Sequence, residues 1–186
     1  MMISTKSTLS TPLVDIILQE NASALGEARD GYRNHIKRVL TYALHLLPAD
    51  AGYREEMEVA LAYHDLGVWT HGTLAYLEPS IDSCLNDPVV AELGLDRNLI
   101  SNIIEYHHKF TSFRGPNADI VNAVRKGDWI DVTRGRMKKG VDESFILKTM
   151  QAHPDLGFRA ALRTALTRNY QSRFTALRDV ATIFRR

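Results

Sequence analysis

The apolar positions of this chain recur mostly at helical spacing, and no alternation typical of a strand persists over several residues. The clearest case is a segment that Pro48 ends and whose apolar residues share one helix face: Ile36, Val39, Leu40, Ala43 and Leu47. The sequence therefore predicts an all-α protein.

The same spacing, together with residues that favour helix ends, predicts further helices. One helix is expected to begin at the cap Thr11-Pro12, and another to cover 53–66 and end at Gly67. Further helices are expected over 97–109, with Asp96 as its cap, and over 117–131. The last two are expected after Gly140 and after Pro154. In the first of these, the expected apolar stripe consists of Leu13, Ile16, Ile17, Ala24 and Ala28. No repeat, low-complexity segment or linker divides the chain. We expect one helical domain over residues 1–186, with a core motif region at 30–135 and a helical extension at 140–186.

Composition narrows the class of protein without defining a function. Apolar residues make up 45% of the chain and charged residues 24%, which is ordinary for a soluble globular protein. The net charge of +1 gives no long-range attraction to a nucleic acid polymer or an anionic membrane. A single cysteine, Cys84, excludes an internal disulfide and a CxxC site. Without a signal-peptide pattern or an apolar run of about 20 residues, a cytoplasmic location is expected.

Several ionisable residues fall on the buried faces of these helices. His64 and Asp65, at the end of an apolar helical stretch, lie within about 60° of Leu61 at 100° per residue. His35 lies at the edge of its own apolar stripe, and Asp128 continues the stripe of the helix over 117–131. A buried carboxylate is costly unless something compensates it. Because His and Asp are suitable ligands for a divalent cation, the spacing favours a metal site.

Other polar residues also point inward, and the constellation has a second interpretation. His107 falls within the stripe of the helix over 97–109, His108 lies at its margin, and Asp131 faces the core side of the next helix. An inward histidine is more often a hydrogen-bonded core residue than a ligand. The buried carboxylates could instead belong to a structural ion network with one of three cations: Arg38, Arg125 or Lys126.

The widely spaced H…HD…D set resembles the HD-domain superfamily of metal-dependent phosphohydrolases, in which such residues bind a divalent metal inside a helical bundle. The match runs from His35 to Asp128, about half of the chain. The resemblance implies an HD-domain-like helical bundle and a metal held by His35, His64, Asp65 and Asp128, with Asp131 as the runner-up for the last ligand. The metal is one divalent ion of Mn, Co, Ni, Fe, Zn or Mg, with a second metal possible.

The resemblance also implies an activity and a set of catalytic residues. The expected reaction is hydrolysis of a phosphoester of a small molecule, with a nucleotide as the leading class, through a metal-activated water. His107 and His108 are similar to a His pair that many members use for a second metal or for substrate. Arg125 would neutralise phosphoryl charge, and His71, in the loop after the HD pair, would act as a general acid. Because the stretch from Cys84 to Asn98 lacks the further histidine usual in two-metal members, one metal is the expected count.

Rival interpretations stay open at this point. The HD fold is also similar to cyanamide-hydratase-like enzymes, so a metal-dependent hydratase or hydrolase of a small carbon–nitrogen compound is one alternative. A diiron oxygenase on the same fold is another, and a non-catalytic binding module is disfavoured because all four presumed ligands are present. The expected partner is a small phosphorylated substrate, with a homodimer possible. Arginines recur in the last predicted helix, a pattern typical of a solvated face and less often of an anion site: 159, 163, 168, 173 and 178.

Overall fold

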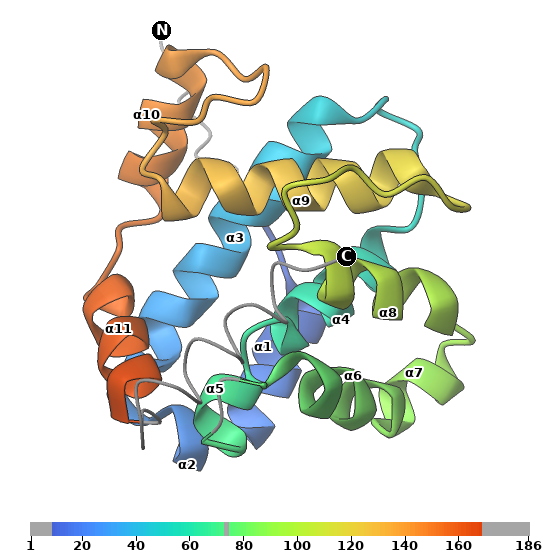
Figure 1. Ribbon diagram of the computed structural model, residues 1–186, viewed down its shortest axis with the longest axis vertical. Coiled ribbons are helices and arrows are strands. Elements are labelled where there is room, and N and C mark those ends of the chain that lie inside the picture. The colour runs from blue at the N-terminus through green and yellow to red at the C-terminus, as the bar shows by residue number, and fades with distance from the viewer. Residues whose placement is uncertain (1–8, 73–74, 169–186) are drawn as a thin grey trace, which may run out of the picture.

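The prediction of an all-α protein is confirmed. The computed structural model describes residues 9–72 and 75–168, and within them every regular element is a helix (Figure 1). No helix in these two ranges is long and apolar enough to cross a membrane. The elements are α1 Pro12–Glu20, α2 Ala22–Leu25, the 3-10 helix η1 Gly26–Ala28, α3 Arg29–Leu46, α4 Arg54–Tyr63, α5 Gly67–Thr70, α6 Leu77–Leu85, α7 Pro88–Glu92, α8 Arg97–Tyr106, α9 Ala118–Val132, α10 Glu143–Ala152 and α11 Phe158–Arg168.

Helix ends follow the predicted signals in most places. Pro12 begins α1, and the Asp96 carboxylate accepts hydrogen bonds from the backbone N–H groups of residues 98 and 99 at the start of α8. Gly67 differs from the prediction, because it begins α5 instead of closing the preceding helix. A Cβ at this position would lie 2.6 Å from the Ser80 Oγ, so glycine allows a close approach of α5 and α6.

The predicted apolar stripe of the first helix is partly wrong. Ile16 is 53% exposed, whereas Val14, Ile17 and Leu18 are buried. The buried face of α1 is turned towards α4, against which it packs, and this rotation leaves Ile16 on the solvent side. Leu13 lies at the margin of the buried face.

The centre of the molecule is formed by α3 and α9, which cross each other at close range (Figure 1). Gly127 makes this possible, because a Cβ there would lie only 2.7 Å from the backbone oxygen of Val39. Helices α4 and α8 pack together and complete the main apolar core. This arrangement brings the inward faces of α3 and α9 next to the C-terminal ends of α4 and α8, where the ionisable residues lie.

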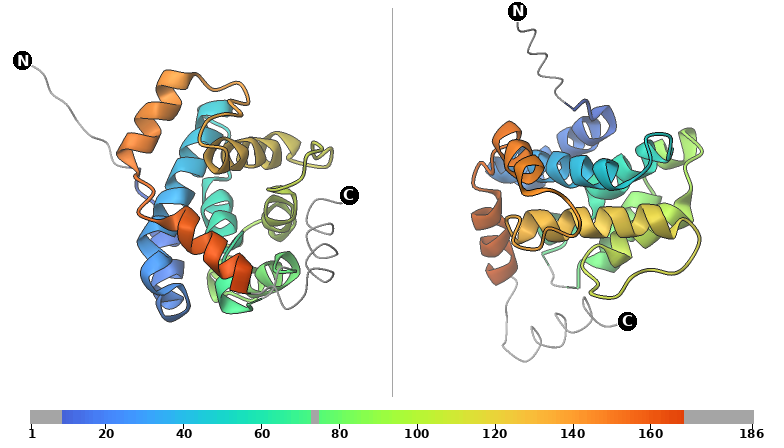
Figure 2. Two further views of the ribbon diagram at one scale, coloured as in Figure 1. Left: turned by 60° about the vertical axis from the view of Figure 1, so that its left-hand side comes forward. Right: turned by 90° about the horizontal axis from the view of Figure 1, so that it is seen from above.

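The last two described helices form the extension beyond the core motif region (Figure 2). Helix α11 packs against α3, α5 and η1, and its first residue, Phe158, is 1% exposed. Gly31 on α3 allows the contact, since a Cβ there would meet Phe158 Cβ at 3.0 Å. The extension therefore contacts the same helix that carries His35.

Candidate metal centre

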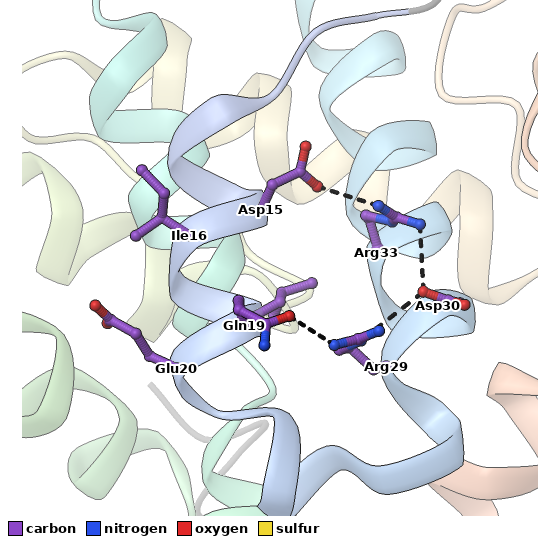
Figure 3. A pocket seen from close by; sticks show the side chains of 8 residues that line it. Asp15, Ile16, Gln19, Glu20, Arg29, Asp30 and Arg33 are labelled. Carbon is purple, nitrogen blue, oxygen red and sulfur yellow. Dashed lines mark hydrogen bonds and ion pairs between the residues drawn. The ribbon is translucent and has the colours of Figure 1, made fainter.

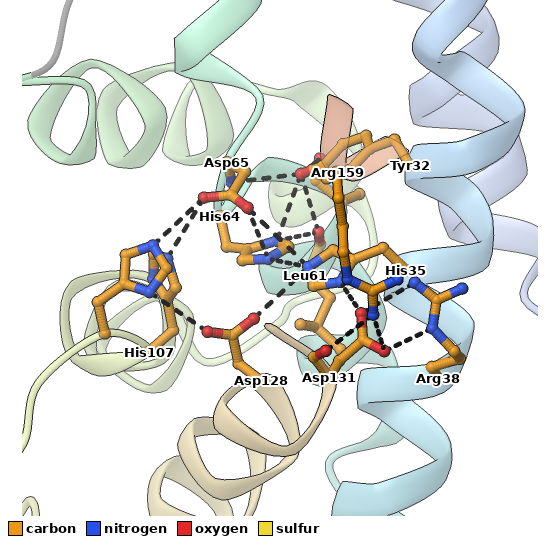
Figure 4. A network of polar contacts seen from close by, with 12 residues as sticks. Tyr32, His35, Arg38, Leu61, His64, Asp65, His107, Asp128, Asp131 and Arg159 are labelled. Carbon is orange, nitrogen blue, oxygen red and sulfur yellow. Dashed lines mark hydrogen bonds and ion pairs between the residues drawn. The ribbon is translucent and has the colours of Figure 1, made fainter. Parts of the chain in front are cut away.

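Six side chains of metal-ligand type converge in the interior, from the inward faces of α3 and α9 and from the turns that follow α4 and α8 (Figure 4). All are buried except His108, whose side chain is 19% exposed. They comprise one residue from α3, two from the turn after α4, two from the turn after α8 and one from α9: His35, His64, Asp65, His107, His108 and Asp128. The structure thus brings together every predicted metal ligand and the predicted His pair.

The Asp65 carboxylate lies between two pairs of histidines. Its Oδ2 atom is 3.4 Å from the Nε2 of His64 and 3.9 Å from the Nε2 of His35. Its Oδ1 atom is 3.5 Å from the Nε2 of His107 and 3.6 Å from the Nε2 of His108. The two oxygens of one carboxylate therefore face two separate imidazole pairs.

Asp128 is placed in the same manner on the opposite side of the cluster. Its Oδ1 is 3.5 Å from the Nε2 of His35, and its Oδ2 is 3.3 Å from the Nδ1 of His108. Among the described residues, neither oxygen receives a hydrogen bond, although both are buried. A buried carboxylate without donors is unfavourable unless a cation satisfies it.

Three of the imidazoles are oriented with Nε2 towards the cluster. The Nδ1 atoms lie near acceptors, at 2.7 Å from Asp131 Oδ2 for His35 and at 2.6 Å from a backbone oxygen for both His64 and His107. Each acceptor favours the tautomer that carries its proton on Nδ1, which leaves a lone pair on Nε2. The Nε2 atoms of His35 and His64 are only 3.1 Å apart, and a positive charge between them would relieve the repulsion of their lone pairs.

Burial and neighbouring charges set the protonation of the cluster. Burial lowers the pKa of His64 to about 4, against the opposing effect of Asp65. Burial alone would raise the pKa of Asp65, but His64, His107 and His108 hold it well below its usual range. The pKa of Asp128 is lowered in the same way, mainly by His108. At neutral pH the carboxylates are ionised and His64 is neutral, which are the forms that bind metal.

His108 differs from the other histidines. Burial lowers its pKa, but the Asp128 and Asp65 carboxylates, at 3.3 and 3.6 Å from its ring nitrogens, outweigh this and raise the pKa to about 10. A histidine with this pKa is protonated at neutral pH, so His108 is a cation that lies between the two carboxylates. A metal ion would take over this role and release the proton.

Asp131, the runner-up ligand, lies behind His35 instead of in the cluster. Its Oδ2 accepts from the His35 Nδ1 at 2.7 Å, and the carboxylate also accepts from Arg38 at 2.5 and 2.9 Å and from Arg159 at 3.2 Å. Burial acts to raise the pKa of Asp131, yet His35 and Arg38 hold it below its usual range. Asp131 thus fixes the orientation of a candidate ligand, and Arg38 pairs with it and not with Asp65 or Asp128.

Two tyrosines that the sequence did not assign to the centre also contact it. The Tyr76 hydroxyl donates to Asp65 Oδ1 at 2.9 Å and lies 2.8 Å from the Nε2 of His108. The Tyr32 hydroxyl donates to the backbone oxygen of Ala62 at 3.1 Å and accepts from the backbone N–H of Asp65 at 3.2 Å. Tyr32 precedes His35 by three residues and shares its helix face, which is a usable signal. Tyr76 follows an aperiodic segment and has none.

Two predicted catalytic residues lie away from the cluster. His71 is exposed, and its Nδ1 is 2.8 Å from the hydroxyl of the adjacent Thr70. The Arg125 guanidinium donates to the backbone oxygens of Lys109 and Phe110 and to the Ser112 hydroxyl. Arg125 therefore holds the loop after α8 in place, and its contacts do not direct it towards a substrate at the cluster.

The donor set fits a divalent cation. Nε2 of His107 and both oxygens of Asp128 are buried and have no hydrogen-bond partner among the described residues, and each lies within 3.5 Å of an atom of another candidate ligand. Imidazole and carboxylate ligands in this number suit Mn, Fe, Co, Ni or Zn. Comparison with protein-family models, curated proteins and solved structures found no match to this chain.

Proposed function

We propose that this protein is a metal-dependent phosphohydrolase that acts on a small phosphorylated molecule. The proposal is carried by one observation, the convergence of four histidines and two aspartates into groups whose candidate ligand atoms lie within 4.8 Å of one another. Imidazoles surround the carboxylates of Asp65 and Asp128, whereas Asp131 forms a structural ion pair with the Arg38 guanidinium.

The chain offers ligands for two ions. His35 and His64 with one oxygen from each aspartate form the first set, and His107 and His108 with the other two oxygens form the second. This geometry favours two metals over the single ion that the sequence suggested. When bound, such ions polarise a phosphoryl oxygen and lower the pKa of a bound water.

The residues of the chain itself perform the remaining tasks. Asp131 keeps the His35 lone pair directed inward, and the Tyr76 hydroxyl orients Asp65. His108 is the exposed edge of the centre, so a substrate approaches from its side. The Tyr76 hydroxyl also lies 2.8 Å from the His108 Nε2, so it helps to position this histidine at the exposed edge.

The test combines metal analysis with a phosphatase screen. Wild type, Asp65→Asn and the matched control Asp119→Asn, an exposed aspartate near the start of α9, are purified without chelator. We expect about two transition-metal ions per wild-type and control chain and phosphate release from a panel of nucleotides and sugar phosphates. Asp65→Asn should lose both the metal and the activity while retaining its far-UV circular dichroism. Wild-type protein that binds no metal even after reconstitution with metal would refute the proposal.

A diiron oxygenase is a second candidate, and the number of ligands favours it. Such an enzyme needs about six protein ligands, and the cluster supplies four histidines and two aspartates. Oxygen consumption by the iron-loaded protein, with no phosphate released from any compound of the panel, would support this alternative.

A further inference from the structure

Four arginines gather around a pocket that is separate from the metal centre. Arg134 and Arg136 belong to the turn after α9, and Arg159 and Arg163 lie one turn apart on α11. The pocket has a volume of about 490 Å³. Leu162 and others supply an apolar part of its wall, and Asp131 and Phe158 also line it. Residues distant in sequence thus line one basic pocket between the turn after α9 and α11.

The positive charge of this pocket is largely uncompensated. Its acidic residue, Asp131, is already paired with Arg38 and His35, and Arg159 contacts both Asp131 and Asp155. Within the described residues, the other three arginines of the pocket form no ion pair with an acidic side chain. Unpaired guanidinium groups that face one cavity match the charge and geometry of phosphate oxygens.

A second pocket on the surface shows what a self-compensated arginine site looks like. Between α1 and the start of α3, Arg33 contacts Asp15 and Asp30, and Arg29 contacts Asp30 and donates to Gln19 (Figure 3). Every arginine there already has an acidic partner. Arginine content alone therefore does not distinguish the basic pocket; its missing counter-charges do.

The basic pocket lies behind His35 as seen from the metal centre. Asp131 contacts the Nδ1 of His35, and the ring of Phe158 stacks on the His35 ring at 4.6 Å between centroids. The opposite ring nitrogen, Nε2, faces the cluster. A ligand in this pocket is therefore one side chain away from the candidate metal ligands without being able to contact them.

We propose that this pocket binds a phosphorylated small molecule with at least two negative charges, as a ligand distinct from the substrate. Its phosphate oxygens would accept hydrogen bonds from Arg134, Arg136 and Arg163, and its less polar part would lie against Leu162. Arg159 lines the pocket and also contacts Asp131. An anion in the pocket would compete with Asp131 for the Arg159 guanidinium, and this would alter the hydrogen bond by which Asp131 orients His35. The pocket would thereby link the concentration of a metabolite to the metal centre.

The experiment uses inorganic pyrophosphate as the probe and isothermal titration calorimetry at low ionic strength. The full-length chain is first treated with a chelator, which is then removed, so that no metal can bind the probe. Wild type is compared with Arg134→Gln/Arg163→Gln and with Arg114→Gln/Lys148→Gln, which removes the same charge from exposed residues outside the pocket. We expect saturable binding that weakens by about tenfold or more in the pocket variant and by less than about twofold in the control.

Two results would overturn the proposal. Equal weakening in both variants would mean that pyrophosphate responds only to net charge. Binding that appears only after metal is added back, and that the pocket variant retains, would place the anion at the metal centre. The calorimetric assay does not depend on phosphatase activity. A negative result in the phosphatase screen would therefore refute the proposed function without affecting the proposed anion pocket.

Discussion

Removal of the Asp131 carboxylate should be one of the most destabilising single changes in the core. Asp131 is 1% exposed and neutralises Arg38, which is itself 1% exposed. After Asp131→Leu, the Arg38 guanidinium would keep only its hydrogen bond to the backbone oxygen of His153, at 2.7 Å, and no counter-charge. Breaking one partner from a buried ion pair costs about 3–5 kcal/mol of unfolding free energy.

The companion change, Arg38→Met, should cost less. Asp131 would still accept hydrogen bonds from His35 and Arg159, so the expected loss is near the lower end of that range, about 3 kcal/mol. The double variant Arg38→Met/Asp131→Leu removes both charges and replaces them with apolar side chains. Its loss should be smaller than the sum of the two single losses, by about 1–3 kcal/mol.

Urea unfolding followed by far-UV circular dichroism measures these differences, with a chelator present so that metal does not contribute. Asp131→Asn serves as a milder variant, because it keeps one oxygen that can accept from Arg38. Additive losses, with the double variant equal to the sum, would refute the reasoning. They would mean that Arg38 and Asp131 do not compensate each other in the folded protein.

Three further predictions follow from the same contacts. Folding lowers the pKa of Asp131, so the difference in unfolding free energy between wild type and Asp131→Asn should have its full value above about pH 4 and shrink as the pH falls below that value. Urea unfolding across this pH range measures the difference. A difference that grows in acid would contradict the prediction. His107→Ala should reduce bound metal from about two ions to about one, whereas the exposed His71→Ala should leave the count unchanged in elemental analysis. Gly127→Ala should cost about 1–3 kcal/mol in urea unfolding, because its methyl group would meet the Val39 backbone oxygen at 2.7 Å; an unchanged midpoint would show that α3 and α9 can separate freely.

Helical periodicity was sufficient to predict the all-α fold and to select the inward-facing ionisable residues. His64 and Asp65 could be placed because their spacing from Leu61 depends only on the geometry of one helix. The same geometry selected His107 and Asp128, which the structure brings to the same cluster. Local periodicity thus determines which side chains enter the core.

The relative placement of different helices was not predictable in this way. Asp131 and Asp128 both face the core side of α9, and only the crossing of α9 over α3 puts Asp131 behind His35. Arg159 reaches Asp131 from α11, across a sequence separation of 28 residues that carries no periodic signal. For Arg125, the sequence indicated a cation near the site but not that its two terminal nitrogens would donate to the loop after α8.

The crossing of α3 and α9 also determines at which stage of folding the candidate centre forms. The ligands His35 and Asp128 are separated by 93 residues, so the complete ligand set forms only after most of the chain has folded. Of the six candidate ligands, only two pairs are adjacent in the sequence, His64-Asp65 and His107-His108. If the proposed metal binds, it binds the native state almost exclusively. The ion would therefore slow unfolding far more than it would speed folding. In a cell that lacks the metal, this protein would then lose its activity and would also be degraded faster by proteases.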